Sequence, residues 1–193
     1  MALLYANIQI EIREISLRDR PTELYAASSK GTVPVLVTLD NFVIDESLDI
    51  MLWSLDNFSN QKWLGVSRNR VLDIIHHNDT EFKKWLDRYK YYDRYPQNSR
   101  EFYREKCAHT LSFYEQYLEQ NQYLLSKDVS LADIAIFPFI RQFANIDNQW
   151  FSNNYNRLTF WFEQISSSDL FINVMEKYPL WNKKDRVIIN SLI

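Results

Sequence analysis

Glu46 and Ser47 are the side chains in this sequence best suited to hold a small zwitterion. They stand where an apolar run ends and a helical pattern begins. The Ser47 hydroxyl and the free N–H groups of a helix start can receive a carboxylate, and the Glu46 carboxylate can accept from an ammonium. An α-amino acid carries both charges. The residues alone favour the alternative, in which Ser47 only caps the helix and Glu46 only matches its dipole.

Pro34 is a second unusual feature, because it stands inside an apolar, β-branched run. Proline cannot donate a ladder hydrogen bond, and the bond before it is the one where a cis peptide costs little. A cis Val33–Pro34 bond would turn the N–H and C=O groups of Val33 outward, toward a peptide-like ligand. The alternative is a trans proline at the start of a strand, which composition alone favours.

The other reactive side chains indicate structure rather than chemistry. Cys107, the only cysteine, lies among aromatic residues on a helical pattern, which indicates an inert core thiol and excludes an intramolecular disulfide. The histidines, His76, His77 and His109, lack metal-ligand spacing and no CxxC motif is present, so we expect no metal site. The G-x-S-x-G, P-loop and G-x-G-x-x-G motifs of hydrolases, kinases and dinucleotide-binding enzymes are absent as well.

Composition narrows the class of protein further. The chain of 193 residues is 46 % hydrophobic and 24 % charged and has only two glycines, which predicts a mostly helical globular protein with few tight turns. Its formal net charge of −3 gives no overall attraction to nucleic acid or to an anionic membrane. No apolar run is long enough to span a membrane, and no signal-peptide pattern is present. We therefore expect a cytoplasmic protein.

The predicted secondary structure is of two kinds, separated near residue 58. Pro34 and Glu46 lie in the first part, which mixes short strands and helices. Before residue 58, short patterns predict a helix end over 1–7, a strand over 8–17, a helix over 21–27, a hairpin of strands over 35–38 and 42–44, and a helix over 47–55. After it, apolar residues recur at spacings of three and four, which predicts only helices, including 100–119, 156–165 and 169–178. Asn78 and Asp79 offer a place where one of these helices could break.

One helix start is marked by Ser130 and Asp133, which form a capping box ahead of the apolar run 134–140. Pro138 inside that run predicts a kink. The whole pattern predicts an α/β domain over residues 1–58, a linker over 59–67 and an all-helical domain over 68–193.

Three motifs, taken together, resemble the soluble glutathione S-transferase superfamily, including a bacterial branch of it. They are the stretch from Thr32 to Leu36, the stretch from Val43 to Trp53 with its Glu-Ser pair, and the stretch from Ser130 to Pro138. Their order and spacing match too, and the resemblance covers nearly the whole chain. It implies a thioredoxin-like N-terminal domain followed by the helical C-terminal domain of that superfamily.

The resemblance also implies a site. Pro34 matches the cis-proline of the family, and Val33 matches the residue whose backbone pairs with the cysteinyl part of glutathione. Glu46 and Ser47 match the pair that holds the γ-glutamyl end, and Thr32 matches a position that often contacts the glycyl carboxylate. Glutathione would be the co-substrate, a small electrophile or disulfide the second substrate, and the protein a homodimer that binds neither nucleic acid nor membranes.

The resemblance fails at the N-terminus. Family members begin with a strand and a loop that carries the catalytic Tyr, Ser or Cys, whereas residues 1–4 resemble the middle of the helix that follows. The catalytic residue therefore stays unassigned. The absent strand would lie between 8–17 and 35–38, where an upstream segment, a closing-up of the strands or a partner could fill the gap. The implied function is a glutathione transferase if the catalytic segment is present; the alternative is a non-catalytic interaction or regulatory protein.

Overall fold

The computed structural model describes residues 1–57, 62–65, 67–183 and 188–189. The chain divides into two compact units, residues 1–61 with 169–193, and residues 62–168. The sequence pattern assigns 169–193 to the helical domain instead; in the structure this segment joins the first unit, because its strand pairs there. Within the predicted linker, residues 59–61 and 66 lie outside the described residues.

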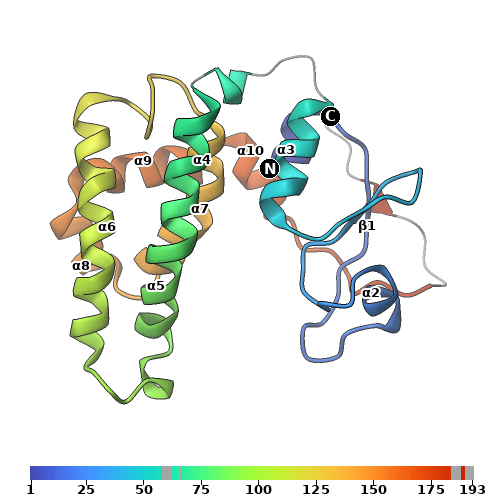
Figure 1. The fold of residues 1–193 in the computed structure, drawn as a ribbon, viewed down its shortest axis with the longest axis horizontal. Coiled ribbons are helices and arrows are strands. Elements are labelled where there is room, and N and C mark those ends of the chain that lie inside the picture. The colour runs from blue at the N-terminus through green and yellow to red at the C-terminus, as the bar shows by residue number, and fades with distance from the viewer. Residues whose placement is uncertain (58–61, 66, 184–187, 190–193) are drawn as a thin grey trace. The chain divides into compact units, whose positions relative to one another are not determined.

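The first unit combines short helices with two small β-ladders (Figure 1). Its helices are α1 (Ala2–Tyr5), α2 (Thr22–Ala27), α3 (Ser47–Asp56) and α10 (Asp169–Val174). Its strands are β1 (Glu11–Ile12), β2 (Leu36–Val37), β3 (Val43–Ile44) and β4 (Ile188–Ile189). The predicted hairpin is present, but the strand predicted over 8–17 is confined to two residues. The last helix ends at Val174 rather than near residue 178.

Each described ladder of the first unit has two antiparallel strands. β1 pairs with β4, with Glu11 opposite Ile189, and β2 pairs with β3, with Leu36 opposite Ile44. The N–H of Trp181 also donates to the main-chain oxygen of Glu14 at 2.7 Å. The C-terminal segment therefore lies along the first strand. No local sequence pattern predicts this pairing, because the two segments are far apart in the chain.

All the regular secondary structure described in the second unit is helical. Figure 1 shows the chain segment of α4 and α5 running beside α6. The α-helices are α4 (Arg68–His77), α5 (Lys83–Lys90), α6 (Arg100–Gln120), α7 (Leu131–Ala144), α8 (Asn148–Asn154) and α9 (Asn156–Ser166). Shorter turns are the 3₁₀ segments η1 (Lys62–Leu64) and η3 (Tyr92–Arg94) and the π-helix η2 (Asn78–Phe82). No described helix is long and apolar enough to cross a membrane.

The π-helix stands where the sequence offers a helix break. Asn78 is fully buried, and its side-chain oxygen accepts from the Tyr114 hydroxyl on α6 at 3.3 Å. The Asn78 side chain is therefore used inside the core rather than as a cap, and the helix continues through residues 78–82 into α5.

The predicted capping box at the start of α7 is confirmed. The Ser130 N–H and hydroxyl both donate to Asp133 Oδ2, at 2.8 and 2.6 Å. The other oxygen, Oδ1, accepts from the N–H of Leu124 at 2.9 Å and from the indole N–H of Trp161 at 2.8 Å. Pro138 lies inside α7, which is assigned as one helix from Leu131 to Ala144.

Candidate functional site

The loop before β2 carries three of the predicted site residues, Thr32, Val33 and Pro34, and all three are exposed. The Val33–Pro34 peptide bond is cis, as the resemblance implies. Gly31, just before them, has a φ of +61°, in the left-handed region that glycine adopts most readily. The loop therefore presents Val33, with 48 % of its surface exposed, to solvent.

The start of α3 carries the other two, Glu46 and Ser47. Glu46 occupies the N-cap position and Ser47 is the first helical residue. The Glu46 side chain accepts no helix N–H, so it does not cap the helix. Both residues are exposed. The positive end of the helix dipole and the first N–H groups of α3 thus remain open to an anionic group at this exposed point.

Lys30 connects the loop to the start of α3. Its ammonium lies 2.5 Å from Glu46 Oε1 and 2.9 Å from Asp45 Oδ1. The Ser28 hydroxyl donates to the other oxygen of Asp45 at 2.6 Å. Lys30 stands two residues before Thr32. Its bonds to Asp45 and Glu46 therefore link the loop before β2 to the start of α3. The sequence analysis did not predict a role for Lys30, Ser28 or Asp45. Only Lys30 could have been suspected, because it is a cation close to Thr32 in the sequence.

The charges of this cluster shift one another's pKa values. The Ser28 hydroxyl, followed by the Lys30 ammonium, holds the pKa of Asp45 below its ordinary value. Glu46 and then Asp45 raise the pKa of Lys30. Asp45 therefore contributes to stability above its unfolded pKa of about 3.9, and this contribution is lost as the pH falls through its lower folded pKa. The contribution of Lys30 is present below its unfolded pKa and is lost as the pH rises through its folded pKa.

Replacing Ser28 by alanine should raise the pKa of Asp45 toward its ordinary value, because the variant lacks the hydroxyl that donates to the carboxylate. The carboxyl-carbon NMR shift of Asp45, followed against pH, measures this directly. The exposed neighbour Ser29 gives the matched control, and Ser29→Ala should leave the titration of Asp45 in place. An unchanged pKa in Ser28→Ala would show that the hydroxyl does not set it.

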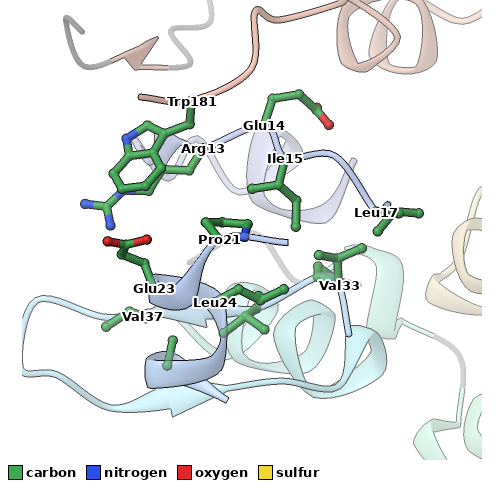
Figure 2. A pocket seen from close by; sticks show the side chains of 13 residues that line it. Arg13, Glu14, Ile15, Leu17, Pro21, Glu23, Leu24, Val33, Val37 and Trp181 are labelled. Atoms are coloured by element: carbon green, nitrogen blue, oxygen red, sulfur yellow. The ribbon is translucent and has the colours of Figure 1, made fainter. Parts of the chain in front are cut away.

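A pocket of about 420 Å³ lies in the first unit between residues 13–17 and 33–37 (Figure 2). Val33 and Pro34 are in its wall, together with the apolar residues Ile15, Leu17, Leu24, Val35 and Val37. Trp181 of the C-terminal segment also lines it. The loop before β2 therefore faces a pocket large enough for a small ligand.

Cys107 is not part of this site. It lies on α6 in the second unit and is fully buried, and burial raises the pKa of its thiol. A protonated, enclosed thiol is a poor nucleophile. Within the described residues, no group of three His, Cys, Asp or Glu side chains could hold a metal ion.

Two family models match the chain, one on each part of it. "Glutathione S-transferase, N-terminal domain" matches residues 1–62, and "Glutathione S-transferase, C-terminal domain" matches residues 77–169. The fold agrees with that of glutathione transferase URE2P6 of Phanerochaete chrysosporium, solved in complex with oxidized glutathione. The TM-score is 0.77 at 14 % identity, over 90 % of this chain and 86 % of that one.

Two curated proteins are similar in sequence. Glutathione S-transferase stcT of Emericella nidulans is 25 % identical over 178 residues, which cover 87 % of this chain and 80 % of that protein. Glutathione S-transferase F10 of Arabidopsis thaliana is 35 % identical over 77 residues, and this match spans only 36 % of its length and 39 % of this chain. With a thioredoxin-like N-terminal domain and a helical C-terminal domain, the chain belongs to the glutathione S-transferase superfamily.

Proposed function

We propose that the chain binds glutathione through the loop before β2 and the start of α3. One observation carries the proposal: Glu46 and Asp45 already hold a primary ammonium, that of Lys30, at the exposed N-terminus of α3. The γ-glutamyl end of glutathione presents an ammonium and a carboxylate on one carbon. Carboxylates beside an open helix N-terminus are the chemical complement of that pair.

Each proposed contact uses a group that the fold leaves accessible. Glu46, whose side chain is 62 % exposed, binds Lys30 through Oε1 and would accept the ligand ammonium through Oε2. The hydroxyl of Ser47 and the first N–H groups of α3 would receive the γ-glutamyl carboxylate. The main chain of Val33 would pair with the cysteinyl residue, and Thr32 would contact the glycyl carboxylate.

The chemical step would use the thiol of glutathione on a small electrophile or disulfide. The chain's own thiol cannot replace it, because Cys107 is enclosed in the helical unit. We assign no catalytic Tyr, Ser or Cys.

The alternative is a non-catalytic interaction or regulatory protein with the same fold. The enclosed thiol of Cys107, the only cysteine of the sequence, favours it. Homodimer formation and a cytoplasmic location accompany either function as proposals that rest on the family. The two functions differ in one measurable respect, because only the transferase forms a thioether or exchanges a disulfide.

Glutathione should bind the purified chain in a calorimetric titration, and Glu46→Gln should weaken binding by about 10- to 100-fold. The change removes a charge-assisted hydrogen bond worth about 1.5–3 kcal/mol. Asp49→Asn is the matched control, because Asp49 lies in the first turn of the same helix and would not touch the ligand. Its affinity should stay within about threefold of the unmodified chain. Equal losses in the two variants would indicate a general effect of helix charge and would count against the site.

A further inference from the structure

Residues 83–106, which include α5 and the start of α6, carry a positive charge that the rest of the chain lacks. They contain eight Lys and Arg against four Asp and Glu, a balance of +4, whereas the formal net charge of the whole chain is −3. The rest of the chain therefore carries −7. α5 and α6 pack side by side (Figure 1), and three of these cations lie around one side chain, that of Trp85.

The cations around Trp85 come from both helices. The Lys84 ammonium lies 4.8 Å and the Arg88 guanidinium carbon 5.2 Å from the centroid of its ring. The Lys106 ammonium, on α6, lies 5.7 Å from the same ring and 5.3 Å from that of Phe102. A ring face attracts a cation but supplies no acceptor oxygen. These contacts therefore hold the three charges close together without satisfying their N–H donors.

Lys84, Arg88 and Lys106, with Trp85 and Phe102, form what we call the α5–α6 cationic patch. Lys84 and Lys106 are exposed and Arg88 is partly exposed. None of the three cations makes an ion pair within the residues that the structure describes. Arg88 donates one N–H to the main-chain oxygen of Lys84 at 2.9 Å. Like charges around one ring repel one another, so an anionic group that pairs with them would be stabilised here.

The acidic side chains near the patch do not neutralise it. Asp87 accepts from a tyrosine hydroxyl at 3.0 Å. The main-chain N–H of Glu101 itself and then Ser99 hold the pKa of the Glu101 carboxyl below its ordinary value, at the start of α6. Glu105 precedes Lys106, and consecutive residues of a helix point about 100° apart. These carboxylates do limit the partner, because a long polyanion would extend beyond the patch onto like charges.

The ring faces distinguish a nucleic acid from a protein as that partner. Bases stack on open aromatic faces, whereas cations lie over the rings of Trp85 and Phe102. Phe102 still has 36 % of its surface exposed, which is enough for contact with an apolar side chain. A short acidic peptide with an apolar residue between its carboxylates matches both the charge and this exposed ring.

We propose that the α5–α6 cationic patch binds a short acidic segment of a partner protein, with an apolar side chain between its carboxylates. Arg88 would hold one carboxylate through two N–H groups, and Lys84 and Lys106 would hold others. The apolar side chain would cover Phe102. The proposal does not depend on glutathione binding, because every residue of the patch belongs to the helical unit.

The probe is the blocked peptide acetyl-Glu-Asp-Phe-Glu-Asp-amide, titrated into the purified chain at low ionic strength and followed by calorimetry. We expect saturable binding that Arg88→Glu weakens by about tenfold or more, since repulsion replaces a charge-assisted pair. Lys127→Glu makes the same change of charge at an exposed position between α6 and α7, and its affinity should stay within about threefold of the unmodified chain. If Arg88→Glu fails to fold, Lys106→Glu replaces it.

Two further probes test the chemistry of the partner. The peptide acetyl-Gln-Asn-Phe-Gln-Asn-amide keeps the shape but lacks the charges, so its failure to bind supports pairing with carboxylates and equal binding overturns it. A short oligothymidylate should bind more weakly than the acidic peptide. Oligothymidylate binding that Arg88→Glu abolishes, without binding of the acidic peptide, overturns the proposed partner in favour of nucleic acid. Absence of acidic-peptide binding, or equal loss in Arg88→Glu and Lys127→Glu, overturns the proposal as well.

Discussion

Asp133→Ala is expected to lower the free energy of unfolding of the helical unit by about 3–5 kcal/mol. The carboxylate is fully buried and accepts from Ser130, Leu124 and the indole of Trp161. Alanine would leave these donors inside the core without a partner, and each unsatisfied group costs about 1–3 kcal/mol. Urea unfolding, followed by far-ultraviolet circular dichroism, measures the loss.

The matched control for Asp133 is an ordinary helix cap. Ser99 caps α6 by accepting from the N–H of Phe102 at 3.2 Å at an exposed position. Ser99→Ala should cost only about 1 kcal/mol. Similar losses in the two variants would contradict the view that Asp133 joins three segments rather than capping one helix.

Phe143→Ala should destabilise the helical unit by a comparable amount, about 3–5 kcal/mol. The ring of Phe143 on α7 is almost fully buried and lies within 5.2–6.2 Å, between centroids, of four aromatic rings. These belong to Phe82, Tyr89, Trp150 and Phe151. Alanine leaves a cavity where the segments carrying these rings meet, which the surrounding rings can fill only in part.

Phe160 gives the control for Phe143, because 54 % of its surface is exposed on α9. Phe160→Ala should change the free energy of unfolding by less than about 1 kcal/mol. Thermal unfolding and urea unfolding of both variants provide the comparison. A loss for Phe143→Ala that is no larger than that for Phe160→Ala would mean that the aromatic cluster does not hold the unit together.

Most of the helical unit could be predicted from the sequence, because its information is local, but α8 (Asn148–Asn154) was not predicted. Apolar residues at helical spacing identify α6 and α9, and the Ser130 and Asp133 pair identifies the start of α7. The π-helix could not be predicted, and neither could the bond between Asn78 at its start and Tyr114, which are 36 positions apart. A local pattern offers Asn78 only as a helix breaker.

The first unit was harder to predict, because part of its structure depends on residues that are far apart in the chain. The hairpin of β2 and β3 follows from alternating residues and a turn between them. The pairing of β1 with β4 joins the two ends of the chain, and nothing in either segment specifies the other. The short strands also depend on tertiary contacts more than on propensity.

In the candidate site, too, the sequence shows local features but not contacts between distant residues. Glu46 and Ser47 stand at a visible transition from strand to helix, and Pro34 interrupts an apolar run, so both places could be found from the sequence. Lys30 could not, because its bonds to Asp45 and Glu46 cross 15 and 16 positions. The sequence therefore predicts which segments form the site, whereas the structure adds the cation that links them.

The central claim, that the chain binds glutathione at the loop before β2 and the start of α3, is tested most directly by NMR. Two-dimensional ¹H–¹⁵N spectra would be recorded on the labelled chain during a titration with glutathione. The account predicts saturable shifts concentrated at Lys30, Thr32, Val33, Glu46 and Ser47, and their loss in Glu46→Gln. Shifts confined to the helical unit, or no shifts from a folded chain at millimolar glutathione, would contradict it.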